Sequence, residues 1–141
     1  MRVNQRLLVE AAYASWDEED LSLLGSVLHV NAVSHIRFPP GTWPMTGVLR
    51  GKRAILSGLG SVSRNFEVAE YRPLTMRGKD GEWTCRARVQ YAHRQSGLVY
   101  QATITNVWTI VGDKITSYDS IHDAELLRTF FQLVNGLKEE V

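Results

Sequence analysis

The chain has 141 residues, and its 16 lysines and arginines nearly balance its 15 aspartates and glutamates, for a formal net charge of +1 at pH 7. This length suits a single domain over residues 1–141 that buries a core without disulfides or metals. Because the basic residues do not gather in one stripe, we expect no nucleic-acid partner. No apolar run reaches the roughly 18 residues that cross a bilayer, and the lone Cys85 forms no disulfide framework, so we expect a soluble cytoplasmic protein without a membrane partner.

The N-terminal segment predicts two helices joined by an acidic turn. Residues 3 to 16 carry apolar side chains at helical spacing, ending at Trp16. The polar run Asp17–Asp20 interrupts this pattern, and Asp20 is suited to cap a second helix whose apolar stripe runs from Leu21 to Leu28. This pattern is typical of a helical hairpin.

A strand is expected from Val30 to Phe38, where two prolines end it. The loop Pro39–Gly51 contains Trp43, which suits a lid, a dimer contact or an aromatic side chain tucked onto the core. A short third helix is expected from Lys52 to Ser57, with Val62 as its furthest limit because two glycines weaken it.

From residue 66 onward the pattern changes to strands. We expect strands over 66–76 and 82–94, and Pro73 indicates that the first lies at a sheet edge. The stretch Leu98–Asp123 predicts a hairpin around the turn Val111–Lys114, which contains a Gly-Asp pair. A terminal helix is expected over Ala124–Val134, with Asp123 as its N-cap.

This order of elements favours an α+β fold with a mainly antiparallel sheet, because helices come early and strands late. A long twisted sheet covered by helices on one face leaves a cone-shaped space, which is a natural pocket for a small molecule. Motifs for phosphate, dinucleotide and zinc binding and the G-x-S-x-G nucleophile motif are missing, and the four histidines are scattered. We therefore expect neither a cofactor nor a metal.

Three stretches of the sequence resemble a known family: AAYASWDEEDLSLLGSVLHVNAV, GKRAI and NVWTIVGDKITSYDSIHDAELL. Over roughly Leu7 to Phe131 the chain resembles the SnoaL-like branch of the NTF2-like superfamily, which includes polyketide cyclases, ketosteroid isomerases and limonene-epoxide hydrolases. The resemblance implies a cone-shaped curved sheet around a deep, mostly apolar pocket, and a homodimer formed through the sheet. The same scaffold also serves non-catalytic roles, so the fold alone leaves the activity open.

The catalytic residues of ketosteroid isomerases are not retained. By alignment with that family, the general-base aspartate falls on Ile36, the helix-1 tyrosine on Ala12, and the oxyanion-stabilising aspartate on Asn106 or Thr105. Proton transfer between two carbons needs a carboxylate base and an oxyanion donor. The sequence therefore argues against ordinary ketosteroid isomerisation.

The epoxide-hydrolase residues are also mostly replaced. That family's Asp-Arg-Asp set falls on Gln90, Arg88 and Ser120, and its water-positioning Tyr and Asn fall on Ser34 and Ile36. Only the arginine is retained. Without a carboxylate to activate water, that reaction is disfavoured too.

The same alignment implies a set of inward side chains that line the pocket together with Trp16: Ser34, Ile36, Arg88, Gln90, Ile104, Asn106, Trp108, Tyr118, Ser120 and His122. Two-residue alternation agrees for three of the four strands. In the strand 83–94, the apolar alternation instead predicts these inward side chains: Trp83, Cys85, Ala87, Val89 and Tyr91. We follow the resemblance there, because a sheet surface that faces a dimer partner is also apolar.

Among these residues, His122 is the candidate acid–base group with a near-neutral pKa, unless it merely ends its strand. Arg88 would bind a carbonyl or acidic group, and Asn106, Gln90 and Tyr118 would polarise and orient the ligand. The expected function is binding of a small, mainly apolar molecule, with an isomerase, cyclase, dehydratase or hydrolase activity that depends on His122. The alternatives are a non-catalytic binder of a small ligand and a protein-interaction module that uses the open sheet face.

Overall fold

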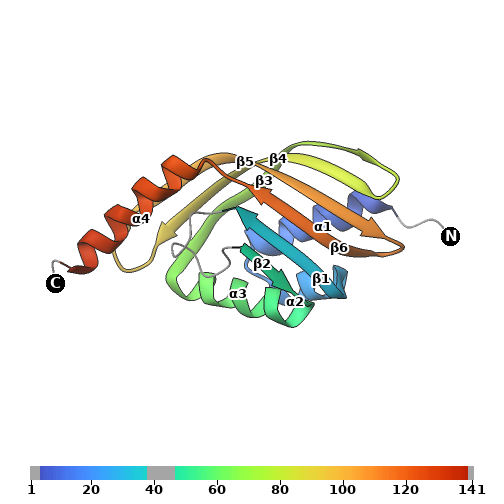
Figure 1. Ribbon diagram of the computed structural model, residues 1–141, viewed down its shortest axis with the longest axis horizontal. Coiled ribbons are helices and arrows are strands. Elements are labelled where there is room, and N and C mark those ends of the chain that lie inside the picture. Colours follow the sequence, from blue (N-terminus) through green and yellow to red (C-terminus); the bar gives the residue numbers. More distant parts are fainter. Residues whose placement is uncertain (1–3, 38–46, 140–141) are drawn as a thin grey trace.

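A computed structural model describes residues 4–37 and 47–139, which form helices packed against one curved sheet (Figure 1). In chain order the elements are α1 (Gln5–Asp17), α2 (Leu21–Val27), β1 (Leu28–Arg37), β2 (Gly47–Arg50), α3 (Lys52–Asn65), β3 (Phe66–Lys79), β4 (Glu82–His93), β5 (Val99–Val111), β6 (Lys114–Ile121) and α4 (Ala124–Glu139). Within the described residues, six strands form one sheet in the order β2-β1-β6-β5-β4-β3. The α+β class expected from the sequence is confirmed.

The sheet is antiparallel except where β1 runs parallel to β6. Strand β1 follows the helical hairpin and pairs with β6, so the first and the last strand in the sequence are neighbours in the sheet. Helices α1 to α3 cover one face, and α4 extends beyond one end of the sheet (Figure 1). No helix in the described part of the chain is both long and apolar enough to span a bilayer.

The helix starts follow the expected capping chemistry. Asp20 accepts hydrogen bonds from the backbone of Ser22 and Leu23, and Asp123 accepts from Glu125 and Leu126. Each carboxylate satisfies amide groups that have no partner within their own helix. Both predicted caps are confirmed.

Several element boundaries differ from the expectation. Helix α3 continues past Val62 to Asn65, because a buried stripe containing Ile55 and Leu59 packs on the sheet and outweighs the low helix propensity of its glycines. Strand β2 lies in a segment expected to be loop, and at four residues it is too short for a clear periodic signal. The loop interpretation of Trp43 falls outside the described residues.

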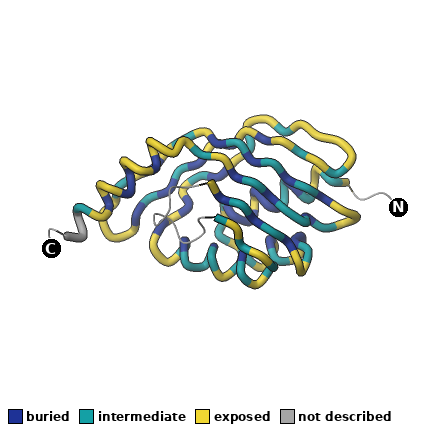
Figure 2. The backbone as a smooth tube through the Cα atoms, viewed as in Figure 1, coloured by how far each residue is buried: buried dark blue, intermediate teal, exposed yellow. Residues whose placement is uncertain are grey.

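Strand β4 faces the opposite way from the expectation based on resemblance. Cys85, Ala87 and Val89 are fully buried, whereas Arg88 is half exposed and its Nε lies 3.4 Å from a carboxylate oxygen of Glu70. The two-residue alternation visible in Figure 2 decides the facing, because burying a guanidinium without a partner costs several kcal/mol. The inward placement of Arg88 was wrong. Gln90 was also expected to point inward, but it lies two residues after Arg88 and therefore on the same outer face.

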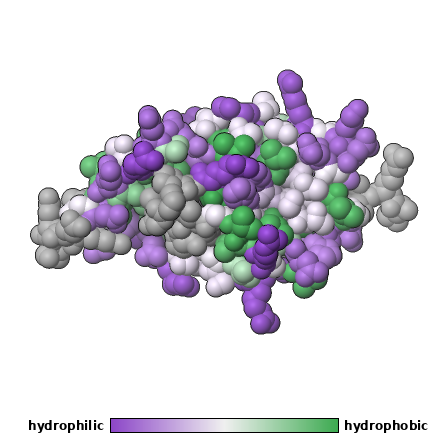
Figure 3. Space-filling view, in the orientation of Figure 1, coloured by the Kyte–Doolittle hydropathy of each residue, from purple (hydrophilic) through white to green (hydrophobic). Residues whose placement is uncertain are grey.

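The polar and apolar side chains on the surface are mixed. Figure 3 shows hydrophobic residues in several separate groups between hydrophilic ones on the face in view. Helix α4 buries Leu127, Phe130 and Phe131, and the two phenylalanines contact the ring of Phe66. This apolar cluster anchors the helix at the end of the sheet.

Candidate functional site

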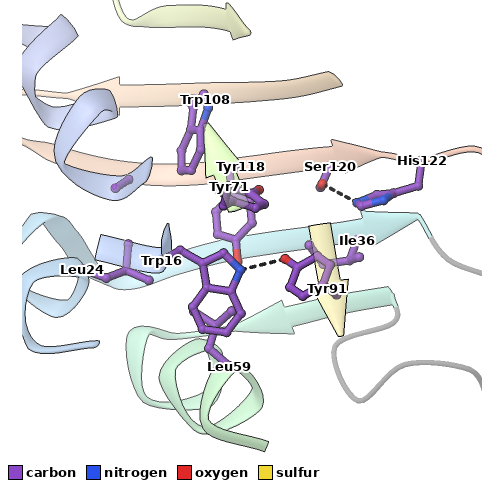
Figure 4. Close-up of a pocket in the computed structure, with 11 residues that line it drawn as sticks. Trp16, Leu24, Ile36, Leu59, Tyr71, Tyr91, Trp108, Tyr118, Ser120 and His122 are labelled. Atoms are coloured by element: carbon purple, nitrogen blue, oxygen red, sulfur yellow. Dashed lines mark hydrogen bonds between the residues drawn. The ribbon is translucent and has the colours of Figure 1, made fainter. Parts of the chain in front are cut away.

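A cavity of about 50 Å³ lies between helices α1–α3 and the inner face of the sheet (Figure 4). Every helix of that layer and five strands contribute to its wall. The lining residues are Ala12, Trp16, Leu24, Ile36, Leu59, Tyr71, Tyr91, Trp108, Tyr118, Ser120 and His122. None of these eleven carries a carboxylate or a permanently charged side chain, so the wall is aromatic and neutral.

The β5–β6 hairpin and the residue that follows it position four of these side chains by alternation. Tyr118 and Ser120 are both buried on the inner face of β6, and His122 follows two residues later. Trp108 of β5 pairs with Tyr118 in the register, and their rings stack with centroids 5.1 Å apart. Stacked rings of this kind form a rigid wall for one side of the cavity.

The polar end of the cavity is formed by Ser120 and His122. The Oγ of Ser120 and the Nε2 of His122 lie 2.9 Å apart, within hydrogen-bond distance (Figure 4). Burial lowers the pKa of His122 from 6.5 to about 3, because the low-dielectric surroundings disfavour the imidazolium. The near-neutral pKa expected from the sequence was wrong. At pH 7 the pair is uncharged, and it can donate or accept hydrogen bonds.

A second polar contact crosses the cavity between helix and sheet. The Nε1 of Trp16 on α1 donates a hydrogen bond of 2.7 Å to the hydroxyl of Tyr91 on β4. Both side chains are buried, and burial raises the pKa of Tyr91 well above its ordinary value. The phenol is therefore neutral over the whole physiological range.

Behind the cavity wall, Asn106 organises a buried cluster of aromatic side chains. Its Nδ2 donates to the hydroxyls of Tyr13 at 2.8 Å and Tyr71 at 3.0 Å, and the Nε1 of Trp108 lies 3.3 Å from the same Tyr13 oxygen. Burial raises the pKa of Tyr71 to about 12 and that of Tyr13 still further. With Asn106 donating both amide protons, the Tyr71 proton is directed away from the amide.

Three phenols in or behind the cavity wall are missing from the set of pocket residues implied by the alignment: Tyr13, Tyr71 and Tyr91. The alignment placed the isomerase tyrosine on Ala12, whereas the buried phenol of α1 is the next residue, Tyr13. Helical spacing from Tyr13 to Trp16 was the signal for the first phenol. For Tyr91 the signal was the apolar alternation of β4, which the resemblance overrode.

Six of the expected pocket residues come together around the cavity: Trp16, Ile36, Trp108, Tyr118, Ser120 and His122. Three others, Ser34, Ile104 and Asn106, are buried but do not line it. Arg88 and Gln90 lie outside it, on the other face of the sheet. Over the described ranges, no three His, Cys, Asp or Glu side chains gather in a way that suits a metal ion.

Comparison with known proteins adds a family and a set of structural neighbours. A family model described as a SnoaL-like domain matches residues 9–118. A search of curated proteins finds no match. Among solved structures, an NTF2-like protein from Burkholderia xenovorans LB400 is 20% identical, with 89% of this chain and 93% of that chain covered at a TM-score of 0.74.

Two further neighbours were crystallised with small molecules. A protein with a ketosteroid isomerase-like fold from Catenulispora acidiphila DSM 44928, in complex with trimethylamine, is 13% identical, with 89% and 92% of the two chains covered and a TM-score of 0.74. TerC, co-crystallised with polyporic acid, is 17% identical, with 89% and 95% covered and a TM-score of 0.76. At these identities the similarity establishes the fold alone, and it confirms the expected NTF2-like architecture.

Proposed function

The chain belongs to the family of SnoaL-like domains, and on this basis we propose that its cavity binds a small, neutral, mainly apolar molecule with at least one hydrogen-bonding group. The resemblance identified in the sequence is confirmed by the family match over residues 9–118. Members of a shared fold differ in activity, so the proposal depends on the site.

The observation that carries the proposal is the aromatic cavity with the neutral Ser120–His122 pair at one end. Apolar rings of a ligand would gain about 25 cal/mol for each Å² removed from water. The pair would orient the ligand through one hydrogen bond. A charged ligand is disfavoured, because no opposite charge among the lining residues compensates its desolvation.

The structural neighbours support a small organic molecule as the class of ligand. The Catenulispora acidiphila protein was crystallised with trimethylamine, and TerC with polyporic acid. These two molecules differ in charge and size, so they support binding of a small molecule rather than a particular ligand for this chain.

A second candidate function is acid–base catalysis of an isomerase, cyclase, dehydratase or hydrolase type. The observation that favours it is the imidazole of His122 at the cavity wall, next to the hydroxyl of Ser120. With its pKa at about 3, this imidazole is a weak base in the empty cavity. The weak basicity of this imidazole favours binding over catalysis.

Identification of a co-purifying ligand tests the binding function. Native mass spectrometry of the purified protein is expected to show a bound neutral molecule, and tryptophan fluorescence is expected to change when that molecule is added back to stripped protein. The substitution His122→Ala tests the second candidate. If the variant still converts the identified molecule, His122 is not the catalytic group; if the variant binds the molecule as the wild type does, the result agrees with a binding function. If no bound molecule is found and no added molecule changes the tryptophan fluorescence, the result would favour the protein-interaction module instead.

We further propose that the chain forms a homodimer through the outer face of the sheet and works in the cytoplasm. Thr103, Thr105 and Val107 of β5 point to that outer face, where short side chains allow close approach of a second sheet. Light scattering after size exclusion is expected to give twice the mass of the chain. The substitution Val107→Glu is expected to return it to a monomer.

A further inference from the structure

We propose that Trp16 sets the size of ligand that the cavity accepts, and that its hydrogen bond to Tyr91 holds the indole in the restricting position. The inference rests on the binding function proposed above and adds the residue that selects among ligands. It starts from the position of this one side chain in the wall.

Trp16 joins two layers of the fold across the cavity. Its Nε1 and the Tyr91 hydroxyl are 2.7 Å apart, although the two residues are 75 positions apart in the sequence. In Figure 4 the indole lies among the lining side chains, between Tyr71 of the sheet and Leu59 of α3. The indole therefore forms part of the cavity wall where the helical layer meets the sheet.

The volume of the cavity shows that something has to move for a larger ligand. About 50 Å³ gives room for about four water-sized spheres, whereas an apolar cavity that holds benzene has roughly 150 Å³, so one ring is already at the limit of what this space accepts. Pockets for drug-sized molecules usually reach roughly 300 Å³ or more. A ligand of two rings therefore does not fit inside this cavity unless a side chain of its wall moves aside.

Trp16 is better placed to open than the other aromatic walls. Tyr91 and Trp108 stand on strands that are paired on both sides, and Tyr71, on the edge strand β3, is restrained by stacking on Tyr13. Trp16 instead stands on the last turn of α1, one residue before the helix ends at Asp17. A rotation of its side chain changes no backbone hydrogen bond.

The hydrogen bond to Tyr91 opposes that rotation. An indole has a single N–H donor and no acceptor, so its polar requirement is met entirely by the Tyr91 oxygen. Turning the ring aside breaks this bond inside a buried region, where an unpaired donor is costly. This hydrogen bond thus holds the indole in place. A small ligand binds without breaking it, whereas a larger ligand has to break it.

Two variants and a matched control test the proposal with phenol and 2-naphthol, two neutral probes that differ by one ring. The measured quantity is the ratio of the two dissociation constants, obtained by calorimetry. Trp16→Leu is expected to shift this ratio about tenfold toward 2-naphthol, as extra space in an apolar pocket does. Tyr91→Phe removes only the acceptor and is expected to shift it about threefold in the same direction.

Trp83→Leu is the control, because Trp83 also donates its indole N–H to a side chain, Gln5, at 3.1 Å, yet does not line the cavity. Its ratio is expected to equal that of the wild type. If Trp16→Leu does not fold, Tyr91→Phe alone tests the proposal. In that variant the proton resonance of the Trp16 indole N–H is expected to shift, and this proton is expected to exchange faster with solvent.

The outcomes separate the inference from the function on which it rests. If phenol binds but neither cavity variant changes the ratio, Trp16 does not select ligand size and the binding function stands. An equal shift in Trp83→Leu would attribute the effect to general loosening and overturn the inference. If neither probe binds the wild type or any variant, the proposed function fails and the inference fails with it.

Discussion

Replacement of His122 by glutamine is expected to remove a large part of the acid sensitivity of the fold. Burial lowers the pKa of this imidazole from 6.5 to about 3 in the folded state. Below pH 6.5 the unfolded chain therefore binds a proton that the folded chain does not, and the free energy of unfolding falls as the pH falls toward 3. Above pH 6.5 both states are neutral at this residue, and its contribution to stability is complete.

The size of the effect follows from the unfolded-state pKa. A pH of 5 lies about 1.5 units below the pKa of His122 in the unfolded chain, and it is still above the pKa of about 3 in the folded chain. His122 is therefore protonated in the unfolded chain and neutral in the folded one. At about 1.4 kcal/mol per unit, the wild type loses about 2 kcal/mol between pH 8 and pH 5 through His122 alone. His122→Gln keeps a hydrogen-bonding group near Ser120 but cannot titrate, so it lacks this loss.

Urea unfolding at pH 8, 6.5 and 5, followed by circular dichroism, measures the difference. The remaining histidines are common to both proteins, so their contributions cancel when the two pH dependences are subtracted. A loss in the wild type that exceeds that of the variant by about 2 kcal/mol is expected. Equal losses in both proteins, or an imidazole resonance of His122 that titrates near 6.5, would refute the lowered pKa of this histidine.

Three substitution experiments test other parts of the structure by urea unfolding, and the third also measures the affinity for phenol. Leu127→Ala is expected to cost about 2–5 kcal/mol because it empties the core contact of α4, and exposed Leu126→Ala about 0.5 kcal/mol or less. Gly81→Ala is expected to be far worse than Gly112→Ala: both have positive φ, but a Cβ at Gly81 would lie 2.7 Å from a backbone oxygen, whereas Gly112 has open space. Arg88→Ala is expected to cost less than about 1 kcal/mol and to leave ligand affinity unchanged, because its ion pair is half exposed on the outer face; a tenfold loss of affinity would contradict that facing.

The parts of the fold with local signals were predictable from the sequence. The helical hairpin follows from apolar spacing and the Asp20 cap, and the β5–β6 hairpin follows from the turn at Gly112 with its positive φ. Strand β4 was the exception. Its alternation pointed Val89 inward correctly, but the distant alignment pointed Arg88 inward, and the packing of the core followed the alternation.

The chemistry of the site was less predictable because it depends on contacts between distant residues. His122 was expected at the cavity wall, but its pKa is set by the helices and strands that surround it. The hydrogen bonds of Asn106 join Tyr13 and Tyr71, which lie 93 and 35 residues away in the sequence. No local pattern indicates such pairs, so the polar cluster could only be seen in three dimensions.

The most direct test of the proposed binding site is the side-chain nitrogen spectrum of the histidines during titration with phenol. The site predicts that the Nε2 resonance of His122 moves with saturation of the cavity, because the phenol hydroxyl joins the Ser120–His122 pair. The resonances of His29 and His35, which lie away from the cavity, are expected to stay unchanged. Saturable phenol binding that leaves His122 unmoved, or no binding at all, would contradict a ligand held at this end of the aromatic cavity.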